Sequence, residues 1–144
     1  MRKTVEIQVP AKVNLQLSVG PKKEDGYHEV VTVFQAISLM DTLKISHADQ
    51  FGISIKGDYT NGVPLDQSNL AYKAVELMAE KFDTDKSIEI EIDKSIPVAG
   101  GMAGGSADAA ATLLGIDALF GLDLSKEELG EIARQLGSDV PFML

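Results

Sequence analysis

Residues 96–108 read Ile–Pro–Val–Ala–Gly–Gly–Met–Ala–Gly–Gly–Ser–Ala–Asp, and this glycine-rich segment decides how the rest of the chain is interpreted. It follows an expected strand over 87–92, where isoleucines alternate with polar residues, and precedes an alanine-rich helix expected over 106–120. Glycine lets the backbone approach a ligand closely, and the N-terminus of the following helix offers unpaired N–H groups and the positive end of its dipole. Such a strand–loop–helix unit can hold phosphate groups without a basic side chain.

The segment differs from two well-known phosphate-binding patterns. Gly100 and Gly105 have the spacing of a P-loop, but Ser106 stands where that loop has a lysine. Met102 breaks the G-x-G-x-x-G pattern of dinucleotide-binding folds. On the loop alone, phosphate binding and a flexible linker or crowded turn are both open interpretations.

Around this loop, the sequence predicts strands in the first half and mainly helices in the second. Asp25–Gly26 predicts a hairpin turn, because both residues tolerate positive φ. Ser125 and Glu128 predict a capping box at the start of the last helix, and Gly137 predicts its end. The expected strands cover 4–9, 13–19, 30–38, 42–46, 51–56 and 87–92, and the expected helices cover 69–82 (with Ser68 as N-cap), 106–120 and the stretch after Ser125.

This order of elements predicts an α+β fold of two layers, with a mixed or antiparallel sheet and helices packed on one face. The apolar run 139–144 follows the last expected helix, and we expect it to begin a further strand. A length of 144 residues fits one domain.

Composition excludes several classes of protein. With 13 Lys and Arg against 22 Asp and Glu, the net charge is −9, which argues against binding to nucleic acid and against attachment to an anionic membrane. The chain has no Cys and only two His, which excludes disulfides, a thiolate nucleophile and a multi-His metal site. A metal would be an oxygen-bound Mg²⁺ that accompanies a nucleotide. The N-terminal residues lack the apolar run of a signal peptide or membrane span, so we expect a cytoplasmic protein.

Several polar and aromatic residues have two interpretations. By spacing alone, Lys12 and Asn14 are expected to face water on an edge strand. Asp139, just past the last expected helix, fits a turn or capping residue. Tyr27 and His28 follow the hairpin turn, where they could meet a base; the alternatives are ordinary strand packing for Tyr27 and a solvated ring for His28.

Four segments taken together resemble the GHMP kinase superfamily, in the same order along the chain. They are Pro10–Leu15, Asp25–Glu29, Ile96–Ala110 and Gly137–Phe142. The first two resemble in particular the branch that acts on 4-diphosphocytidyl-2-C-methyl-D-erythritol. The resemblance implies ATP-dependent phosphorylation of the 2-hydroxyl of that small-molecule substrate, with ATP and Mg²⁺ as cofactors, in the non-mevalonate route to isoprenoids.

The resemblance also implies roles for individual residues. Asp139 would be the base that accepts the proton of the substrate hydroxyl, and Lys12 beside it would stabilise charge on the reacting phosphoryl group. Substrate binding would fall to Asn14, Tyr27, His28 and Phe34, with Tyr27 and His28 recognising cytosine. The implied nucleotide-binding residues are Asn69 on the adenine side and, in the loop, Pro97, Val98, Ala99, Gly100, Gly101, Met102, Ala103, Gly104, Gly105, Ser106 and Ala107.

The chain departs from the family pattern in two ways. Many members have a second hydroxyl in the loop where this sequence has Ala107, followed by Asp108. Members are also about twice as long, so we expect residues 1–144 to be the N-terminal, ATP-binding and catalytic domain, truncated and with the C-terminal domain absent. We expect such a chain to turn over poorly alone, because one wall of the cleft is missing, and its apolar end to favour self-association.

Two other functions remain open from the sequence. One is a different GHMP kinase, acting on mevalonate, homoserine or a sugar, although the segment 25–29 argues against it. The other is a non-catalytic nucleotide-binding half-domain. The first would phosphorylate a different alcohol, and the second would bind ATP without releasing ADP.

Overall fold

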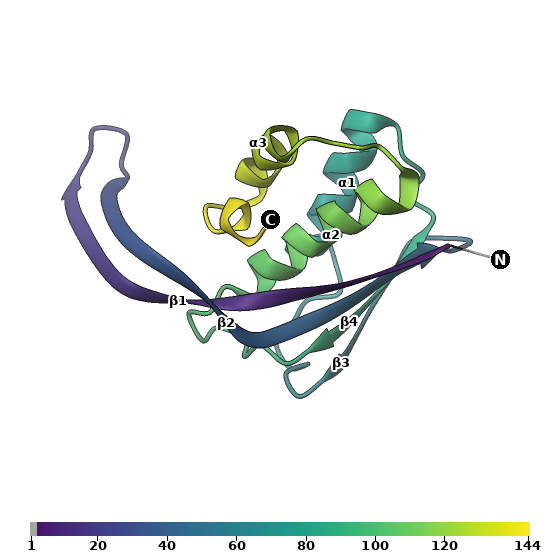
Figure 1. Cartoon of the computed structure of the whole chain (residues 1–144), viewed down its shortest axis with the longest axis horizontal. Coiled ribbons are helices and arrows are strands. Elements are labelled where there is room, and N and C mark those ends of the chain that lie inside the picture. Colours follow the sequence, from purple (N-terminus) through teal and green to yellow (C-terminus); the bar gives the residue numbers. More distant parts are fainter. Residues whose placement is uncertain (1–2) are drawn as a thin grey trace.

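The structure is a computed structural model that describes residues 3–144. Over these residues the chain forms a four-stranded sheet, three α-helices and one short 3-10 helix, with the helices gathered on one face of the sheet (Figure 1). The predicted two-layer α+β architecture is confirmed. In chain order the elements are β1 (Thr4–Lys22), β2 (His28–His47), β3 (Gly52–Gly57), α1 (Leu70–Phe82), β4 (Ile88–Lys94), α2 (Gly104–Phe120), α3 (Lys126–Leu136) and η1 (Val140–Met143).

The sheet has the order β1-β2-β4-β3, with antiparallel neighbours except for the parallel pair β3 and β4. The expected breaks within the first two strands are wrong, because β1 and β2 each run without interruption as one long strand. Pro10 is tolerated because β1 is an edge strand, and register shifts such as the one between Pro10 and Lys12 bend the ribbon without ending it. The predicted turn at Asp25–Gly26 joins the two strands, with φ of 86° at Gly26.

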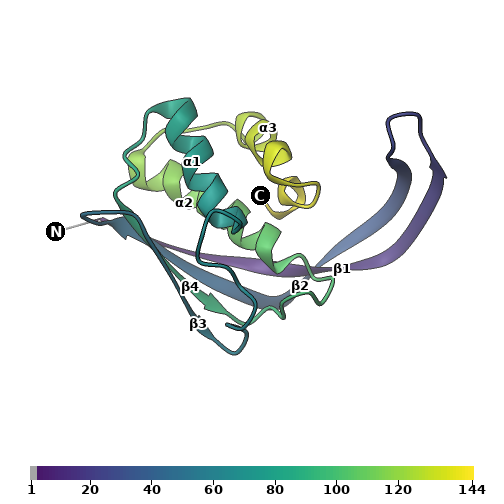
Figure 2. The ribbon, with the colours of Figure 1, turned by 180° about the vertical axis from the view of Figure 1, so that it is seen from behind.

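The two long strands continue beyond the helical layer as a curved two-stranded ribbon (Figures 1 and 2). Apolar side chains on this part of β1 and β2, among them Leu17, Val19, Val31 and Val33, are about half exposed or more. The hydrophobic core lies instead beneath the helices, where Leu43 and Ile45 of β2 and the isoleucines of β4 are fully buried.

Helix α2 occupies the centre of the molecule, between the sheet and the other helices. Alanines, together with Leu113 and Ile116, are buried around most of its circumference, as expected for a helix packed on several sides. Its C-cap is Gly121, as predicted. No helix among residues 3–144 has the length and apolar character needed to cross a membrane.

The caps of the other two helices confirm one prediction and correct another. The capping box of Ser125 and Glu128 is present at the start of α3, with Gly137 as C-cap. For α1 the predicted cap Ser68 is wrong: Asn69 is the N-cap, and its Oδ1 accepts a hydrogen bond from Ala71 N at 2.8 Å. The hydroxyl of Ser68 is directed to Asp66 Oδ1 instead, at 2.6 Å.

The apolar run after α3 is not a strand, contrary to expectation. Val140–Met143 forms η1, with Pro141 in its first turn, where the ring favours a helical φ and the missing N–H has no consequence. Val140 and Met143 are buried in the core. Phe142 is the exposed member of this turn, at 41%.

Gly115 sets how closely α2 approaches the sheet, and replacing it tests that packing. A Cβ at this position would overlap Ile45 Cδ1 and lie 2.9 Å from Ile7 Cδ1. We expect Gly115→Ala to lower the free energy of unfolding by about 1–3 kcal/mol, because overpacking exceeds the gain in helix propensity. The matched change Gly130→Ala in α3, where the nearest atom is Arg134 Nη1 at 3.9 Å, should raise it by about 0.5–1 kcal/mol. Urea denaturation of both variants measures the difference, and equal effects would contradict the packing argument.

Candidate functional site

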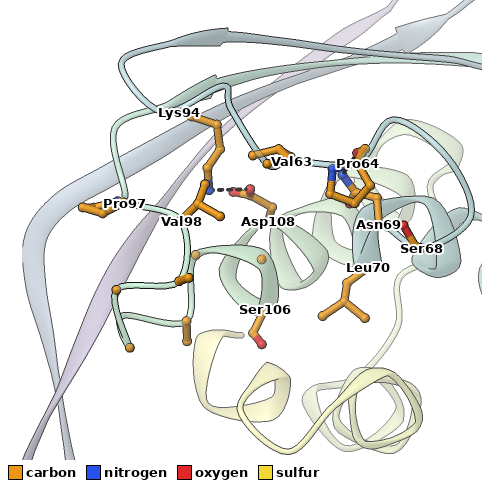
Figure 3. A pocket seen from close by; sticks show the side chains of 17 residues that line it. Val63, Pro64, Ser68, Asn69, Leu70, Lys94, Pro97, Val98, Ser106 and Asp108 are labelled. Atoms are coloured by element: carbon orange, nitrogen blue, oxygen red, sulfur yellow. Dashed lines mark hydrogen bonds and ion pairs between the residues drawn. The ribbon is translucent and has the colours of Figure 1, made fainter.

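A pocket of about 310 Å³ lies between the glycine-rich loop and the start of α1 (Figure 3). This volume is within the range of small-molecule sites. Apolar side chains form much of its wall, and the backbone of the loop forms one side. The lining residues are Gly62, Val63, Pro64, Ser68, Asn69, Leu70, Lys94, Pro97, Val98, Ala99, Gly100, Gly101, Ala103, Gly104, Gly105, Ser106 and Asp108.

The loop enters α2 through a strained backbone. Ala99, Gly101 and Ala103 all have positive φ, of 59°, 72° and 56°, and such conformations at non-glycine residues cluster at functional sites. Helix α2 begins at Gly104 without a side-chain cap, so its first N–H groups are available to a ligand. A Cβ at Gly104 would lie 3.0 Å from Lys94 Nζ, whereas one at Gly105 would meet nothing within 4 Å. The loop is therefore packed tightly at its base and open at its outer side.

The opposite wall of the pocket is fixed by hydrogen bonds to the backbone. Asn69 Nδ2 donates to Pro64 O at 2.8 Å, while the same side chain caps α1. Gly57 has φ of 103° and lies so close to Lys94 that a Cβ would be 2.5 Å from Lys94 O; Asp58 N donates to the same oxygen at 3.0 Å. These contacts hold the segment 62–64 across from the loop.

Beneath the loop lies a buried cluster of three charged residues. Lys94 Nζ contacts Asp41 Oδ2 at 2.5 Å and Asp108 Oδ2 at 2.9 Å, and all three side chains are at most 4% exposed. Figure 3 shows the contact between Lys94 and Asp108. Asp41 Oδ1 also accepts hydrogen bonds from Ser95 N and Ile96 N, at 2.8 and 2.9 Å. The cluster thereby ties β2, the start of the loop and α2 together.

Burial and neighbouring charges shift the pKa values of two residues of this cluster, Asp108 and Lys94. Burial raises the pKa of Asp108 well above the ordinary value, an effect that neighbouring Asp41 reinforces and Lys94 opposes. For Lys94, burial acts to lower the pKa, but the two aspartates together outweigh it and the pKa is raised. The lysine is therefore cationic at neutral pH.

Lys12 joins the loop to the end of the chain. Its backbone N donates to Met102 O at 3.1 Å, and its Nζ donates to Asn14 Oδ1 at 2.7 Å and lies 3.9 Å from Asp139 Oδ2. The same Nζ lies 5.1 Å from the centre of the Phe34 ring. An ammonium and a partly exposed carboxylate thus stand next to the loop, an arrangement suited to charge stabilisation and proton transfer.

These contacts correct the expectation that Lys12 faces water. Lys12 is 6% exposed, and its Nζ lies beside the Phe34 ring and the Asp139 carboxylate. Asn14 is exposed as expected, and its Nδ2 donates to Thr32 Oγ1 at 2.7 Å. Asp139 stands at the N-cap position of η1, yet its side chain makes no cap hydrogen bond and is turned to Lys12 instead.

The structure brings most of the predicted nucleotide-side residues together around the pocket. The exceptions are Met102 and Ala107, which do not line it. Met102 is half-buried and bonds Lys12 through its carbonyl, and Ala107 is buried in the first turns of α2, where its N–H donates to Ala103 O. Asn69 lines the pocket, but both ends of its amide already bond the backbone.

The predicted substrate-side residues are divided between two places. Phe34 packs on Phe142 with ring centres 4.8 Å apart, next to Lys12. Tyr27 lies in the exposed hairpin, 76% accessible and without the strand packing that was the alternative for it, and the His28 ring is exposed with Nδ1 2.8 Å from Gly20 O. Six positions along β2 separate His28 from Phe34, which corresponds to about 20 Å of strand.

The sequence interpretation missed the cluster of Asp41, Lys94 and Asp108. A signal was present, because Ile88, Ile90 and Ile92 alternate onto the buried face of β4 and position 94 continues that alternation. A lysine at a core-facing position requires a partner of opposite charge. Among residues 3–144, no group of three or more His, Cys, Asp or Glu side chains is arranged to hold a metal ion.

Comparison with known proteins gives consistent results. Residues 69–144 match the family described as GHMP kinases N terminal domain. Over 97% of its length the chain is 54% identical to the 4-diphosphocytidyl-2-C-methyl-D-erythritol kinase of Rhodococcus jostii, and over 98% it is 52% identical to that of Mycobacterium avium. In both cases it covers 45% of the relative, so the chain spans about half the length of the curated relatives it matches.

Solved structures show the same fold. A crystal structure of 4-(cytidine 5′-diphospho)-2C-methyl-D-erythritol kinase superposes with a TM-score of 0.74 at 40% identity, covering 96% of this chain and 48% of that one. A homoserine kinase from Cytophaga hutchinsonii superposes with a TM-score of 0.65 at 19% identity, covering 94% of this chain and 41% of that one. The similarity to the homoserine kinase shows only that the two proteins share a fold.

Proposed function

The chain belongs to the GHMP kinase family, and from this premise we propose that it is the ATP-binding and catalytic domain of a kinase for 4-diphosphocytidyl-2-C-methyl-D-erythritol. The observation that carries the proposal is the pair of Lys12 and Asp139 beside a glycine-loop pocket. The identity to kinases of that name supports the choice of acceptor.

ATP would occupy the pocket between the loop and α1. The triphosphate would lie against the loop and the N-terminus of α2, where free N–H groups and the helix dipole favour negative charge. The base would lie between apolar residues such as Val63 and Leu70. Mg²⁺ would be held mainly by the phosphates and water, which is its usual mode with nucleotides and needs no cluster of protein carboxylates.

The transfer step would use the pair next to the loop. Asp139 would accept the proton of the 2-hydroxyl as the hydroxyl oxygen forms its bond to the γ-phosphorus and the bond from that phosphorus to the β–γ bridging oxygen breaks, releasing ADP. Lys12 would stabilise negative charge on the reacting phosphoryl group. Its amine is held in place for this task by Asn14 and the Phe34 ring.

The acceptor would extend along the β1–β2 ribbon. Tyr27 and His28 would bind the cytosine, and Asn14 and Phe34 would bind the part of the acceptor near its hydroxyl. A molecule with a base at one end and the reacting alcohol at the other suits two groups of residues separated by about 20 Å of strand.

The decisive experiment measures ADP release by the 144-residue chain with MgATP and each of three acceptors: the cytidine-linked methylerythritol, homoserine and mevalonate. We expect release with the first acceptor only, and at a low rate, because one wall of the cleft is missing from this chain. Calorimetric titration with MgADP, run in parallel, reports nucleotide binding independently of turnover. The two measurements together distinguish loss of the acceptor from loss of the nucleotide.

Each of the other outcomes would contradict a different part of the proposal. Release with homoserine or mevalonate, and none with the cytidine-linked acceptor, would contradict the proposed substrate. Nucleotide binding without release from any acceptor would indicate a nucleotide-binding domain that is not catalytic by itself. No binding of MgADP would overturn the assignment of the pocket.

A further inference from the structure

A chain of hydrogen bonds links the amine of Lys12 to the backbone of its own strand. Lys12 Nζ donates to Asn14 Oδ1, and Asn14 Nδ2 donates to Thr32 Oγ1. The Thr32 hydroxyl in turn donates to Gln16 O. Each of the three donor–acceptor distances is 2.7 Å, within the range of well-formed hydrogen bonds. The amine is therefore connected, through two side chains, to a fixed point of the main chain.

This chain of hydrogen bonds crosses an irregularity in the pairing of β1 with β2. Asn14 is paired with Phe34, and Gln16 is paired with the neighbouring residue, Val33. Leu15 is therefore an extra residue in β1, as in a β-bulge. Bulges redirect the adjacent side chains and are frequent beside active sites. The irregularity lies between the residue that contacts the lysine amine and the carbonyl at which the hydrogen-bond chain ends.

The Thr32 hydroxyl determines which end of the Asn14 amide faces Lys12. Its single proton is directed to Gln16 O, so its oxygen accepts from Asn14 and does not donate to it. The amide must then present its N–H group to Thr32, which leaves Oδ1 for the lysine, whose ammonium has only donors. The two ends of an amide are nearly identical in shape, so packing alone does not distinguish them. The reversed amide would place an N–H group against the ammonium.

We propose that Thr32 is a positioning residue of the transfer step, which holds the Asn14 amide in the orientation that fixes the Lys12 amine. The inference rests on the proposed function, because it takes Lys12 as the group that stabilises charge on the phosphoryl group. A lysine amine is a point charge on a flexible stem, and its 3.9 Å separation from Asp139 Oδ2 is longer than a hydrogen bond. The directional bond to Asn14 is therefore the contact that defines where the amine lies.

Two substitutions of Thr32 test this role, measured as the single-turnover rate of ADP release by the 144-residue chain with MgATP and the cytidine-linked acceptor. Thr32→Val keeps the shape and the strand preference but cannot hydrogen-bond. We expect it to lower the rate about 10-fold, because a displaced catalytic group is costly even at small displacements. Thr32→Ser keeps the hydroxyl and should stay within about 3-fold of the wild type. Thr42→Val makes the same change on the same strand, opposite Gln8, and should leave the rate unchanged.

Two further measurements distinguish positioning from a general structural role. Thr32 does not line the pocket, so Thr32→Val should bind MgADP with unchanged affinity in a calorimetric titration. In an Asn14→Ala background, Thr32→Val should cause no further loss of rate, because Thr32 acts on Lys12 only through Asn14. A residue that merely stabilised the ribbon would lower the rate by the same factor in both backgrounds.

Nuclear magnetic resonance of the isotope-labelled chain detects the contact without turnover. Thr32→Val should shift the side-chain amide signals of Asn14 and the Hε signals of Lys12. The Lys12 signals are sensitive to displacement, because Nζ lies 5.1 Å from the centre of the Phe34 ring, whose ring current varies steeply with position. Thr32→Ser and Thr42→Val should leave both sets of signals close to those of the wild type.

Several outcomes would overturn the proposal. It is wrong if Thr32→Val releases ADP as fast as the wild type, or if the substitution lowers the rate equally with and without Asn14. A wild type that releases no ADP with any acceptor would contradict the proposed function. The magnetic resonance signals would then decide the inference by themselves: unchanged Lys12 signals in Thr32→Val would overturn it, and shifted signals would support it.

Discussion

In a full-length context, replacing Asp139 by Asn should lower the rate of ADP release with MgATP and the cytidine-linked acceptor by about 10²–10⁴-fold, the range for loss of a positioned acid–base group. Asn cannot accept the proton of the hydroxyl, while its size leaves the local packing unchanged. The Asp139 side chain is 34% exposed and makes no cap hydrogen bond to η1, so the substitution should leave η1 in place while it removes the counter-charge of Lys12. The measurement is kcat for the variant and the wild type under saturating substrates.

Two controls make this result specific. Asp139 does not line the pocket, so Asp139→Asn should bind MgADP with unchanged affinity. Asp83→Asn makes the same chemical change at the exposed C-cap of α1, where Asn tolerates the left-handed conformation, and should leave kcat unchanged. A normal kcat in Asp139→Asn would remove this residue from the mechanism.

Replacing Lys94 by Met should have the largest effect on stability, lowering the free energy of unfolding at neutral pH by about 3–5 kcal/mol. The thioether fills similar space but leaves Asp41 and Asp108 buried without their cation. Urea denaturation followed by circular dichroism measures the change. The decrease in the free energy of unfolding caused by Lys94→Met should become smaller as the pH is lowered. Burial raises the pKa of Asp108 in the folded state, so the folded protein binds a proton at a higher pH than the unfolded chain does, and lowering the pH favours the folded state.

The sheet offers a matched control for this substitution. Lys56 in β3 forms an ion pair with Glu91 at 2.7 Å, but both side chains are largely exposed to solvent. Lys56→Met should therefore change stability little, since exposed pairs contribute little. Equal losses in the two variants would show that the buried cluster does not stabilise the fold in the way described.

The helices and the loop could be predicted from the sequence because their signals are local. The capping box at Ser125, the C-cap at Gly121 and the hairpin turn at Asp25–Gly26 each depend on residues a few positions apart. The alternation of β4 likewise indicates its buried face. For these elements the local preference and the final structure agree.

The burial of Lys12 could not be predicted in this way, because its causes lie far along the chain. Phe34 reaches it from the neighbouring strand, and Asp139 approaches from a turn more than a hundred residues later. The 3-10 conformation of residues 140–143 is also a tertiary effect, because Val140 and Met143 become buried only when α3 has returned to the core. The continuity of β1 through Pro10 depends on its place at the edge of the sheet.

The two-stranded ribbon has a consequence for the distribution of stability. Two strands without a third strand or a helix against them are marginally stable, whereas the part of the sheet under α2 is held by the hydrophobic core and the buried charges. The distal ribbon should therefore open locally at a fraction of the free energy needed to unfold the whole protein. Local opening of the ribbon around Tyr27 and His28 therefore does not require unfolding of the part of the molecule that holds Lys12 and Asp139. The hairpin can change its conformation while the contact between Lys12 and Asp139 is kept.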